Sequence, residues 1–412
     1  MNSKQLSILL VLGLVIGGLG LYLYQGREAS YKSSDQSIGK KVLGEFPIND
    51  VAQITIKNAT NELNLVKQDD LWKVRERFNY PANFSEISEF VRKTSELKAV
   101  QSMKVGLSQF GRFELIKPEK AVGTNSGTLV EFKDKNGKPL KSLLLGKKYV
   151  KESQSSSQFG GGDWPIGRYV MVLNQTQDVA IVSDPLSNVE PKPDQWLNKD
   201  FLKVEKLQTV SLVSTNTTNS WKVTRETETG EWKLADKKEG EEIDKGKSSS
   251  LNYALSSPSF NDVASPQLTP EATGMDHPIV ATLETFDGFV YTAKIGNKTG
   301  DENYYLAMAV KGNLPTERTA GKDEKPEDKE KLDKEFKEKA AKLKEKFDKE
   351  KAIESWTYLV SKWTIDPLLK ERKDLLAEKK DDTKKDEKVK DQDKSKVDDL
   401  FKEDEKEKDE SK

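Results

Sequence analysis

The sequence predicts an α+β protein in which two tandem repeats, each a mostly antiparallel sheet with one or two helices, follow a single N-terminal transmembrane helix. Three observations support this fold class. The chain begins with a long uncharged run, its other apolar residues fall in short alternating stretches separated by turn residues, and the order of these stretches recurs in the second half. Alternation with a period of two is typical of half-buried strands, so sheets dominate the prediction.

The N-terminal run from Leu6 to Tyr24 contains 19 residues without a charge. As a helix it would be about 28 Å long, which is enough to cross the hydrocarbon core of a bilayer. A cleavable signal peptide needs a shorter apolar core and a small-x-small cleavage site, whereas "QGRE" follows this run. We therefore predict an uncleaved anchor over residues 1–25 and a Ser-, Lys- and Gly-rich linker over residues 26–45.

The charges around this span favour two different orientations. Lysine and arginine are more numerous after the span than before it, which by the positive-inside rule places the body of the protein in the cytoplasm. A very short basic N-terminal tail, here with Lys4, is instead how exported signal anchors begin. We expect a single-pass protein of the bacterial cytoplasmic membrane whose body is extracytoplasmic.

Residues 46–203 are predicted to form the first repeat. Its strand-like runs include "VAQITIK", "LNLV", "LWKV", "RYVMVL" and "DVAIVS". Between them, "FSEISEFVRKTSEL" has apolar residues at helical spacing, with Pro81 and Asn83 upstream as helix start signals. Asn136 and Gly137 stand between two further apolar runs, and Asn-Gly is the strongest short signal of a β-hairpin.

Residues 204–378 are predicted to form the second repeat, because the same elements recur in the same order. Trp232 in "GEWKLAD" corresponds to Trp72 in "DLWKVRE", and Gly296 corresponds to Gly146 after the hairpin. An Asp-Gly pair replaces the Asn-Gly pair of the first hairpin. This agreement in order indicates an internal duplication.

An insertion interrupts the second repeat. The offset between matched positions is 150 at the two glycines but 178 at residues 181–183 and 359–361, a difference of 28. We predict a charged helical insertion over residues 315–354, and we expect Thr357–Ser361 to pair with the strand around residues 305–310 despite the gap. Deleting the insertion should then leave the fold intact, whereas truncation at Ala352 should expose a sheet edge.

Residues 322–354 carry 12 lysines and 12 acidic residues, with a narrow apolar stripe at spacings of four, three and four that includes Ala340. Such a helix is either a solvated arm or a coiled-coil-like arm that docks on a partner. Residues 379–412 hold 12 lysines and 14 acidic residues in 34 positions, which predicts a disordered tail. The candidate partner contacts are Phe336, Leu343 and Phe347 in the insertion, Trp164 in a glycine-rich loop, and Leu400 and Phe401 in the tail.

The composition excludes several classes of function. Lysine plus arginine total 68 and aspartate plus glutamate total 69, so the chain lacks the excess positive charge that nucleic-acid binding needs. There is no cysteine, and the one histidine, His277, lies in "MDHP", which is typical of a turn. The glycine-rich "FGGGDWPIGRY" matches neither a dinucleotide-binding fingerprint nor a P-loop. We therefore predict no catalytic, metal-binding or cofactor-binding residues, although acidic pairs are too numerous to be dismissed one by one.

Four stretches carry a resemblance to a known family. They read "FPINDVAQITIKNATNELNLVKQDDLWKV", "YPANFSEISEFVRKTSELKAVQ", "GRYVMVLNQTQDVAIVSD" and "WLNKDFLKVEKLQTVSLVS". Over roughly residues 42–376 the chain resembles the bacterial domain of unknown function 4340. The resemblance implies a membrane-anchored protein, often encoded near ABC-transporter permease and ATPase genes of the gliding-motility type. It implies no catalytic residues, and the charged insertion and tail depart from the usual pattern.

These observations lead to three hypotheses about function. The first is a non-enzymatic accessory or scaffold protein of a cell-envelope transport complex of the ABC type, with a permease as a partner. The second is an envelope module that binds glycan or peptide in the cleft between the two repeats. The third, a hydrolase, would require clustered polar groups in a pocket with shifted pKa values.

Overall fold

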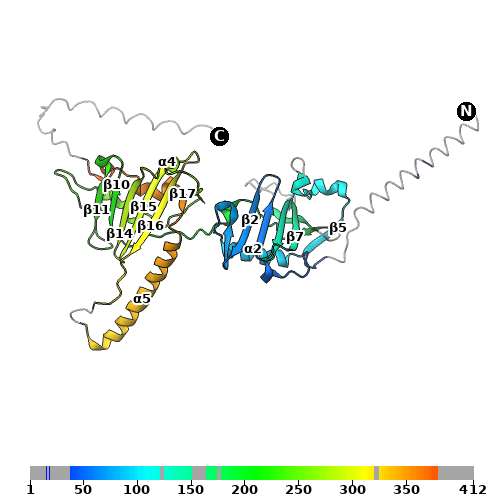
Figure 1. Cartoon of the computed structure of the whole chain (residues 1–412), viewed down its shortest axis with the longest axis horizontal. Helices are drawn as coiled ribbons and strands as arrows, with labels where there is room; N and C mark the ends of the chain where they lie inside the picture. Colours follow the sequence, from blue (N-terminus) through cyan, green and yellow to red (C-terminus); the bar gives the residue numbers. More distant parts are fainter. Residues whose placement is uncertain are drawn as a thin grey trace, which may run out of the picture.

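The computed structural model describes residues 38–120, 125–150, 164–173, 178–319 and 324–378, together with Val15 and Gly18. These residues form a mixed α+β structure with two antiparallel sheets and few helices (Figure 1). Within them, no helix is both long and apolar enough to cross a membrane. The predicted span from Leu6 to Tyr24 lies outside the described residues, except for Val15 and Gly18.

The first sheet has nine strands in the order β4-β3-β2-β1-β6-β7-β8-β9-β5. All neighbouring strands are antiparallel, and the predicted hairpin joins β6 and β7, with Gly137 at a φ of 78° in its turn. Only glycine adopts such a backbone conformation without strain. The strands are β1 Gln53–Lys57, β2 Glu62–Gln68, β3 Leu71–Val74, β4 Tyr80–Pro81, β5 Ala99–Lys104, β6 Thr128–Lys133, β7 Pro139–Val150, β8 Pro165–Val172 and β9 Asp178–Val182.

The second sheet has eight strands in the order β12-β11-β10-β14-β15-β16-β17-β13. Its strands are β10 Leu207–Val213, β11 Trp221–Thr224, β12 Lys233–Leu234, β13 Asp262–Val263, β14 Ile279–Thr285, β15 Phe289–Lys298, β16 Asn303–Gly312 and β17 Thr357–Ser361. The predicted pairing across the insertion is confirmed, because Tyr305 on β16 lies opposite Leu359 on β17. On its other side β17 pairs with β13, so β17 is an interior strand.

The two sheets have the same connectivity. Strands β1 to β3 correspond to β10 to β12, β6 to β9 correspond to β14 to β17, and β5 and β13 end their sheets in the same way. Strand β4 has no counterpart. Gly146 and Gly296 are equivalent in structure as well as in sequence. A Cβ atom at Gly146 would lie 2.2 Å from the Phe113 carbonyl oxygen, and one at Gly296 would lie 2.1 Å from that of Thr273.

Each repeat covers one face of its sheet with short helices. In the first repeat α2 (Phe84–Glu96) begins at the N-cap Asn83 and buries Ile87, Phe90 and Val91. Its counterpart in the second repeat is shorter. The helical elements of the second repeat that cover the corresponding face of its sheet are α3 Lys245–Ser248, the 3-10 helix η9 Ser249–Tyr253, α6 Lys362–Ile365 and the 3-10 helices η10 Asp366–Leu368 and η11 Arg372–Leu375, whereas α4 Pro270–Thr273 lies over Gly296 on the opposite face.

The opposite face of the sheet differs between the repeats. In the first repeat a second apolar cluster on this face contains Leu144 of β7 and Phe110, the buried residue of the 3-10 helix η4 (Leu107–Phe113). In the second repeat the strand pairing and the matched glycines give Lys294 the position of Leu144, and Lys294 is exposed. Because a lysine replaces a buried leucine, this face of the second sheet carries no such cluster among the described residues.

The predicted insertion contains α5 (Pro326–Ala352), which lies between β16 and β17 in the sequence and projects away from the second sheet (Figure 1). Its C-terminal half is part of the second repeat. Leu343 and Phe347 pack against the core, and the Phe347 ring centroid lies 6.5 Å from that of Phe289. Glu350 is only 5% exposed. The apolar stripe therefore packs, at its C-terminal end, on the protein's own sheet.

Aromatic side chains fill the contact between the repeats. Tyr80 of the first repeat is 1% exposed, and its ring centroid lies 5.0 Å from that of Trp356 and 5.8 Å from that of Phe260, both in the second repeat. Beside them, Arg77 Nε lies 2.6 Å from Asp262 Oδ1. These contacts hold the repeats together through packed side chains, so the geometry gives no support to a binding cleft at this point.

Candidate functional site

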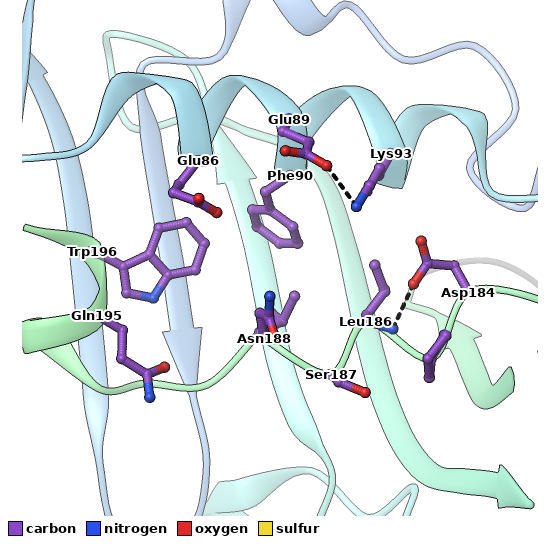
Figure 2. Close-up of a pocket in the computed structure, with 12 residues that line it drawn as sticks. Glu86, Glu89, Phe90, Lys93, Asp184, Leu186, Ser187, Asn188, Gln195 and Trp196 are labelled. Carbon is purple, nitrogen blue, oxygen red and sulfur yellow. Dashed lines mark hydrogen bonds and ion pairs between the residues drawn. The ribbon is translucent and has the colours of Figure 1, made fainter. Parts of the chain in front are cut away.

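A groove in the first repeat is the candidate site. It runs between α2 and the segment 184–196, which follows β9 and includes the 3-10 helix η7 (Pro193–Trp196), and it has a volume of about 620 Å³. This volume is in the range of pockets that bind small molecules or short peptides. Figure 2 shows the side chains of α2 on one side of the groove and those of the segment 184–196 on the other.

The α2 wall presents two carboxylates and one ammonium group. Glu86, Glu89 and Lys93 lie three and four residues apart, so they share one face of the helix. Glu89 Oε1 lies 2.7 Å from Lys93 Nζ, and the hydrogen bond from Lys93 lowers the pKa of Glu89. Within the described part of the chain, no cation pairs with Glu86. The wall therefore has one negative charge that is available to a ligand.

The opposite wall is the turn 184–189, which hydrogen bonds fix to the first sheet. Asp184 Oδ1 accepts a hydrogen bond of 2.8 Å from the Leu186 amide, and Leu186 has a φ of 45°, which is uncommon for a residue with a side chain. The Arg168 guanidinium donates to the Leu186 carbonyl at 3.2 Å and to the Gly146 carbonyl at 2.8 Å. Burial lowers the pKa of Arg168. These bonds fix the turn to strands β7 and β8.

The base of the groove is aromatic. The Phe90 and Trp196 rings lie edge to face with centroids 5.6 Å apart, and both side chains are buried. Trp196 Nε1 donates to the Glu190 carbonyl at 3.2 Å, while the Trp196 carbonyl accepts from the Asn83 amide at 2.8 Å. The tryptophan therefore connects both walls and fixes the width of the groove at this end.

Polar side chains without partners line the rest of the groove. Among the described residues, Ser187, Asn188 and Gln195 make no side-chain hydrogen bond, and Asn188 and Gln195 are exposed. The charged lining consists of Glu86, Glu89 and Asp184 against Lys93 alone, which gives a formal charge of −2. An aromatic base with acidic and amide walls is suited to binding a ligand that carries positive charge and hydrogen-bond donors.

The predicted contact residues do not lie in this groove. Trp164, directly before β8, is 81% exposed. Phe336, Leu343 and Ala340 line a hollow of about 210 Å³ between α5 and the β14–β15 hairpin. Leu400 and Phe401 lie outside the described residues. Apart from this small hollow, the predicted contact residues that the structure describes do not lie together in a pocket.

Neither the histidine nor the acidic residues of the described ranges form a further site. His277 is exposed and its Nδ1 lies 2.8 Å from Asp276 Oδ2 in the same turn. No group of three or more His, Cys, Asp or Glu side chains within the described ranges could hold a metal ion. Sequence reasoning missed the groove because its residues are common polar types. The available signal was the acidic residue at Glu86 where the second repeat has Lys247.

The fold and the groove define a class of protein, a duplicated α+β structure with a ligand-sized groove in its first repeat. The chain belongs to the family of DUF4340, a domain of unknown function, whose family model matches residues 72–278. This range begins in β3 and ends directly before β14, so it includes both walls of the groove. No curated protein and no solved structure matches the chain at a significant level.

Proposed function

We propose that this chain is a non-enzymatic, membrane-anchored accessory or scaffold protein of a cell-envelope transport complex of the ABC type. Residues 6–24 are its anchor in the cytoplasmic membrane, and its body is extracytoplasmic. The observation that carries this proposal is α5, a helix of 27 residues that is fastened at one end and projects from the body at the other (Figure 1). A rigid projecting helix is a common way to present a surface to a partner.

Several ion pairs fasten the C-terminal half of α5. Lys339 Nζ lies 2.9 Å from Asp287 Oδ1 in the hairpin turn, and Lys346 Nζ lies 3.2 Å from Glu205 Oε2 in the segment 197–206, which joins the two sheets. Together with the packing of Phe347, these contacts fix the direction of the helix. Its first ten residues extend about 15 Å further, at 1.5 Å per residue.

The projecting end is held against its own connecting loop. Arg318 Nε lies 2.7 Å from Asp333 Oδ1, and Arg318 also pairs with Glu324. These pairs join Arg318, on the strand side of the loop, to the N-terminal part of α5, so the described residues at this end form one charged unit. A partner that docks here would meet an ordered surface, which lowers the entropic cost of binding.

The test is purification of the full chain with an affinity tag after extraction of membranes in a mild detergent. We expect ABC permease subunits to co-purify. A variant that lacks residues 316–341 should lose them, because this deletion removes the projecting half but keeps Leu343, Phe347 and Glu350. The control is Glu345→Ala, which changes an exposed side chain on the retained part of α5 and should keep the partner. Removal of residues 379–412 separately tests the candidate contacts Leu400 and Phe401 in the tail. A full-length chain that purifies without any transport subunit would contradict the proposal.

A binding module for peptide or glycan is the second candidate function. It is favoured by the groove of about 620 Å³ between α2 and the segment 184–196. The groove lies within the first repeat, so this candidate places the ligand there and not between the repeats. The two functions are compatible, because a scaffold can hold one partner through its arm and bind a segment of another in its groove.

A further inference from the structure

The second repeat contains a counterpart of the groove walls, and hydrogen bonds establish the equivalence. Asn83 caps α2 by accepting from the amide three residues later, and Asp244 caps α3 in the same way. The Asn83 amide donates to the Trp196 carbonyl at 2.8 Å, and the Asp244 amide donates to the Leu375 carbonyl at 2.8 Å.

The flanking residues are equivalent as well. Isolated bridges pair Ala82 with Leu197 in the first repeat and Ile243 with Leu376 in the second. In each bridge, one residue directly precedes the N-cap and the other directly follows the residue whose carbonyl accepts from the N-cap amide. The third residue after each N-cap is therefore the same structural position in both repeats. The first repeat has Glu86 there and the second has Lys247.

In the second repeat two lysine side chains close the space between these walls. Lys247 Nζ donates to the Leu376 carbonyl at 3.1 Å. Lys370 Nζ, from the opposite wall, donates to the Lys247 carbonyl at 2.6 Å. One ammonium group crosses from the helix to the C-terminal segment and the other crosses in the reverse direction, so two hydrogen bonds from lysine side chains join these walls.

In the first repeat no described side chain makes this crossing. Glu86 has the position of Lys247, and the segment 184–196 contributes Asp184, Asn188 and Gln195 to the groove and no lysine. The Glu86 carboxylate, which can accept from an ammonium group, lines the groove, whereas no described lysine donates across it. The groove is therefore open, acidic and complementary to the groups that close its counterpart.

We propose that the groove of the first repeat binds a lysine-bearing peptide segment of a partner protein. The segment lies between α2 and the turn 184–189, with a lysine ammonium group at Glu86 and its apolar stem against Phe90 and Trp196. The ligand supplies the positive charge that Lys247 and Lys370 supply within the second repeat. The inference rests on the proposed function in one respect, because it takes the partner to be a subunit of the same complex.

The charge of the lining favours a basic peptide over a neutral glycan. Glu86 and Asp184 face the groove without a paired lysine, whereas Lys93 is already paired with Glu89 at 2.7 Å. The exposed Glu86 carboxylate and the half-buried Asp184 carboxylate attract a cation, and a neutral ligand lacks this attraction. The side chains of Asn188 and Gln195 can pair with the main chain of an extended peptide.

The test uses the full-length chain in detergent and a fluorescein-labelled pentapeptide with lysine at alternate positions and alanine elsewhere. Binding is measured by fluorescence anisotropy. A second peptide with norleucine in place of lysine keeps the stem and removes the charge, and we expect it to bind at least about tenfold more weakly, which corresponds to about 1.4 kcal/mol. Equal binding of the two peptides would overturn the proposal, as would no binding of the lysine peptide.

The variant Glu86→Lys locates the site. It introduces the residue type of the second repeat, and we expect the new ammonium group to reach the Leu197 carbonyl and close the groove. Affinity for the lysine peptide should fall at least about tenfold. The control Glu96→Lys makes the same charge change on the same helix, outside the groove, and should bind within about twofold of the unaltered chain. Unfolding midpoints of both variants show whether each remains folded.

The outcomes separate this inference from the proposed function. If Glu86→Lys binds the lysine peptide as well as the unaltered chain does, the groove is not the site and the inference fails. Binding of a neutral oligosaccharide in place of the lysine peptide overturns it too. If the peptide binds but no transport subunit co-purifies with the chain, the inference stands and the proposed function fails. Co-purification without peptide binding gives the reverse result.

Discussion

The Glu350 carboxylate accepts a hydrogen bond of 2.9 Å from the Lys203 amide, although 147 residues separate the two. Lys203 lies in the segment that joins the repeats, and Glu350 lies near the C-terminal end of α5. The other oxygen of Glu350 accepts a hydrogen bond of 2.8 Å from the Tyr291 hydroxyl. Burial raises the pKa of Tyr291, and the nearby negative charge of Glu350 raises it further. The base of the arm is therefore bonded both to the second sheet and to the connection between repeats.

The substitution Glu350→Ala should destabilise the second repeat. It removes the acceptor of the buried Tyr291 hydroxyl, which is left with only a long contact of 3.5 Å to the Lys203 carbonyl, and loss of such a buried hydrogen bond costs about 1–3 kcal/mol. It also removes the acceptor of the Lys203 amide, which is only partly buried. We expect a lower free energy of unfolding in urea at neutral pH. Glu345→Ala is the control, because Glu345 is exposed on the same helix and, among the described residues, pairs with Lys349 alone. Equal effects of the two variants would contradict the role assigned to Glu350.

Two deletions should distinguish the dispensable part of the insertion from the part that belongs to the core. Removal of residues 316–341 should leave the unfolding midpoint nearly unchanged, because it keeps Leu343, Phe347 and Glu350, through which α5 packs on and bonds to the second repeat. Removal of residues 316–352 should lower it, because Phe347 and Glu350 are lost. The measurement is thermal unfolding followed by circular dichroism, and similar midpoints for the two deletions would show that the core does not need α5.

The duplication could be predicted from the sequence because strand periodicity, turn glycines and two tryptophans are local signals. The predicted pairing of β16 with β17 depended only on the order of these signals, and the structure confirms it. The apolar stripe on α5 could be predicted as well, but the sequence did not indicate the surface against which it packs. A pattern of apolar residues indicates that a face is buried and does not indicate what covers it. The packing of Phe347 on Phe289 could therefore not be predicted from the sequence.

The groove could not be predicted, because it is a space that no side chain fills between α2 and the segment 184–196, which lie about 100 residues apart in the sequence. Glu86 and Asp184 are ordinary surface residues in the sequence, and only the fold brings them to facing walls. A comparison of the two repeats, residue by residue after Asn83 and Asp244, would have revealed the exchange of glutamate for lysine. The burial of Glu350 was also unpredictable, since the 12 acidic residues of the stretch 322–354 have similar surroundings in the sequence.

The two matched glycines should be equally intolerant of a side chain. A Cβ atom at Gly146 or Gly296 would lie 2.2 Å or 2.1 Å from a main-chain oxygen, so Gly146→Ala and Gly296→Ala force the neighbouring segment to move. Such overpacking typically costs about 1–3 kcal/mol in the free energy of unfolding. Gly106→Ala is the control, because a Cβ atom there would have no other atom within 4 Å and the φ of Gly106 is −69°. Chemical unfolding of all three variants tests the prediction, and a tolerated change at only one matched glycine would count against structural equivalence.

The aromatic contact between the repeats should control their relative orientation. Tyr80→Ala removes a buried ring that packs on Trp356 and Phe260, and loss of a large buried aromatic side chain costs about 3–5 kcal/mol when it is fully enclosed. Because this ring lies at the junction, we expect the substitution to loosen the contact between the repeats. Burial raises the pKa of Tyr80 to about 12, so the hydroxyl stays neutral at physiological pH and does not complicate the comparison.

Distances between spin labels can measure this loosening. The chain has no cysteine, so cysteines introduced at the exposed positions Thr60 and Thr217 label one site in each repeat. The distance distribution should be narrow in the parent and broader in Tyr80→Ala. Tyr253→Ala removes an exposed tyrosine and should leave the distribution unchanged. An equally narrow distribution in Tyr80→Ala would show that other contacts fix the orientation.

The pair formed by Glu241 and Arg372 should make the stability of the second repeat depend on pH in the acid range. Arg372 is 5% exposed, and its Nη2 and Nε atoms lie 2.6 Å and 3.0 Å from the two oxygens of Glu241. The hydrogen bonds from Arg372 lower the pKa of Glu241 to about 2, from an ordinary value of 4.5. A carboxyl whose pKa is lower in the folded state stabilises the fold fully above its unfolded pKa and loses this effect as the pH falls through its folded pKa.

We therefore expect Glu241→Gln to lower the unfolding midpoint at pH 7, and the difference from the unaltered chain to shrink between about pH 4.5 and pH 2. Below this range Glu241 is protonated in both states, so the charged interaction with Arg372 is lost in the unaltered chain as well. Glu239→Gln changes an exposed neighbouring carboxylate and should follow the unaltered chain at every pH. Urea unfolding at a series of pH values provides the comparison. A difference that stays constant from pH 7 to pH 2 would mean that Glu241 acts through its shape or its neutral hydrogen bonds and not through its charge.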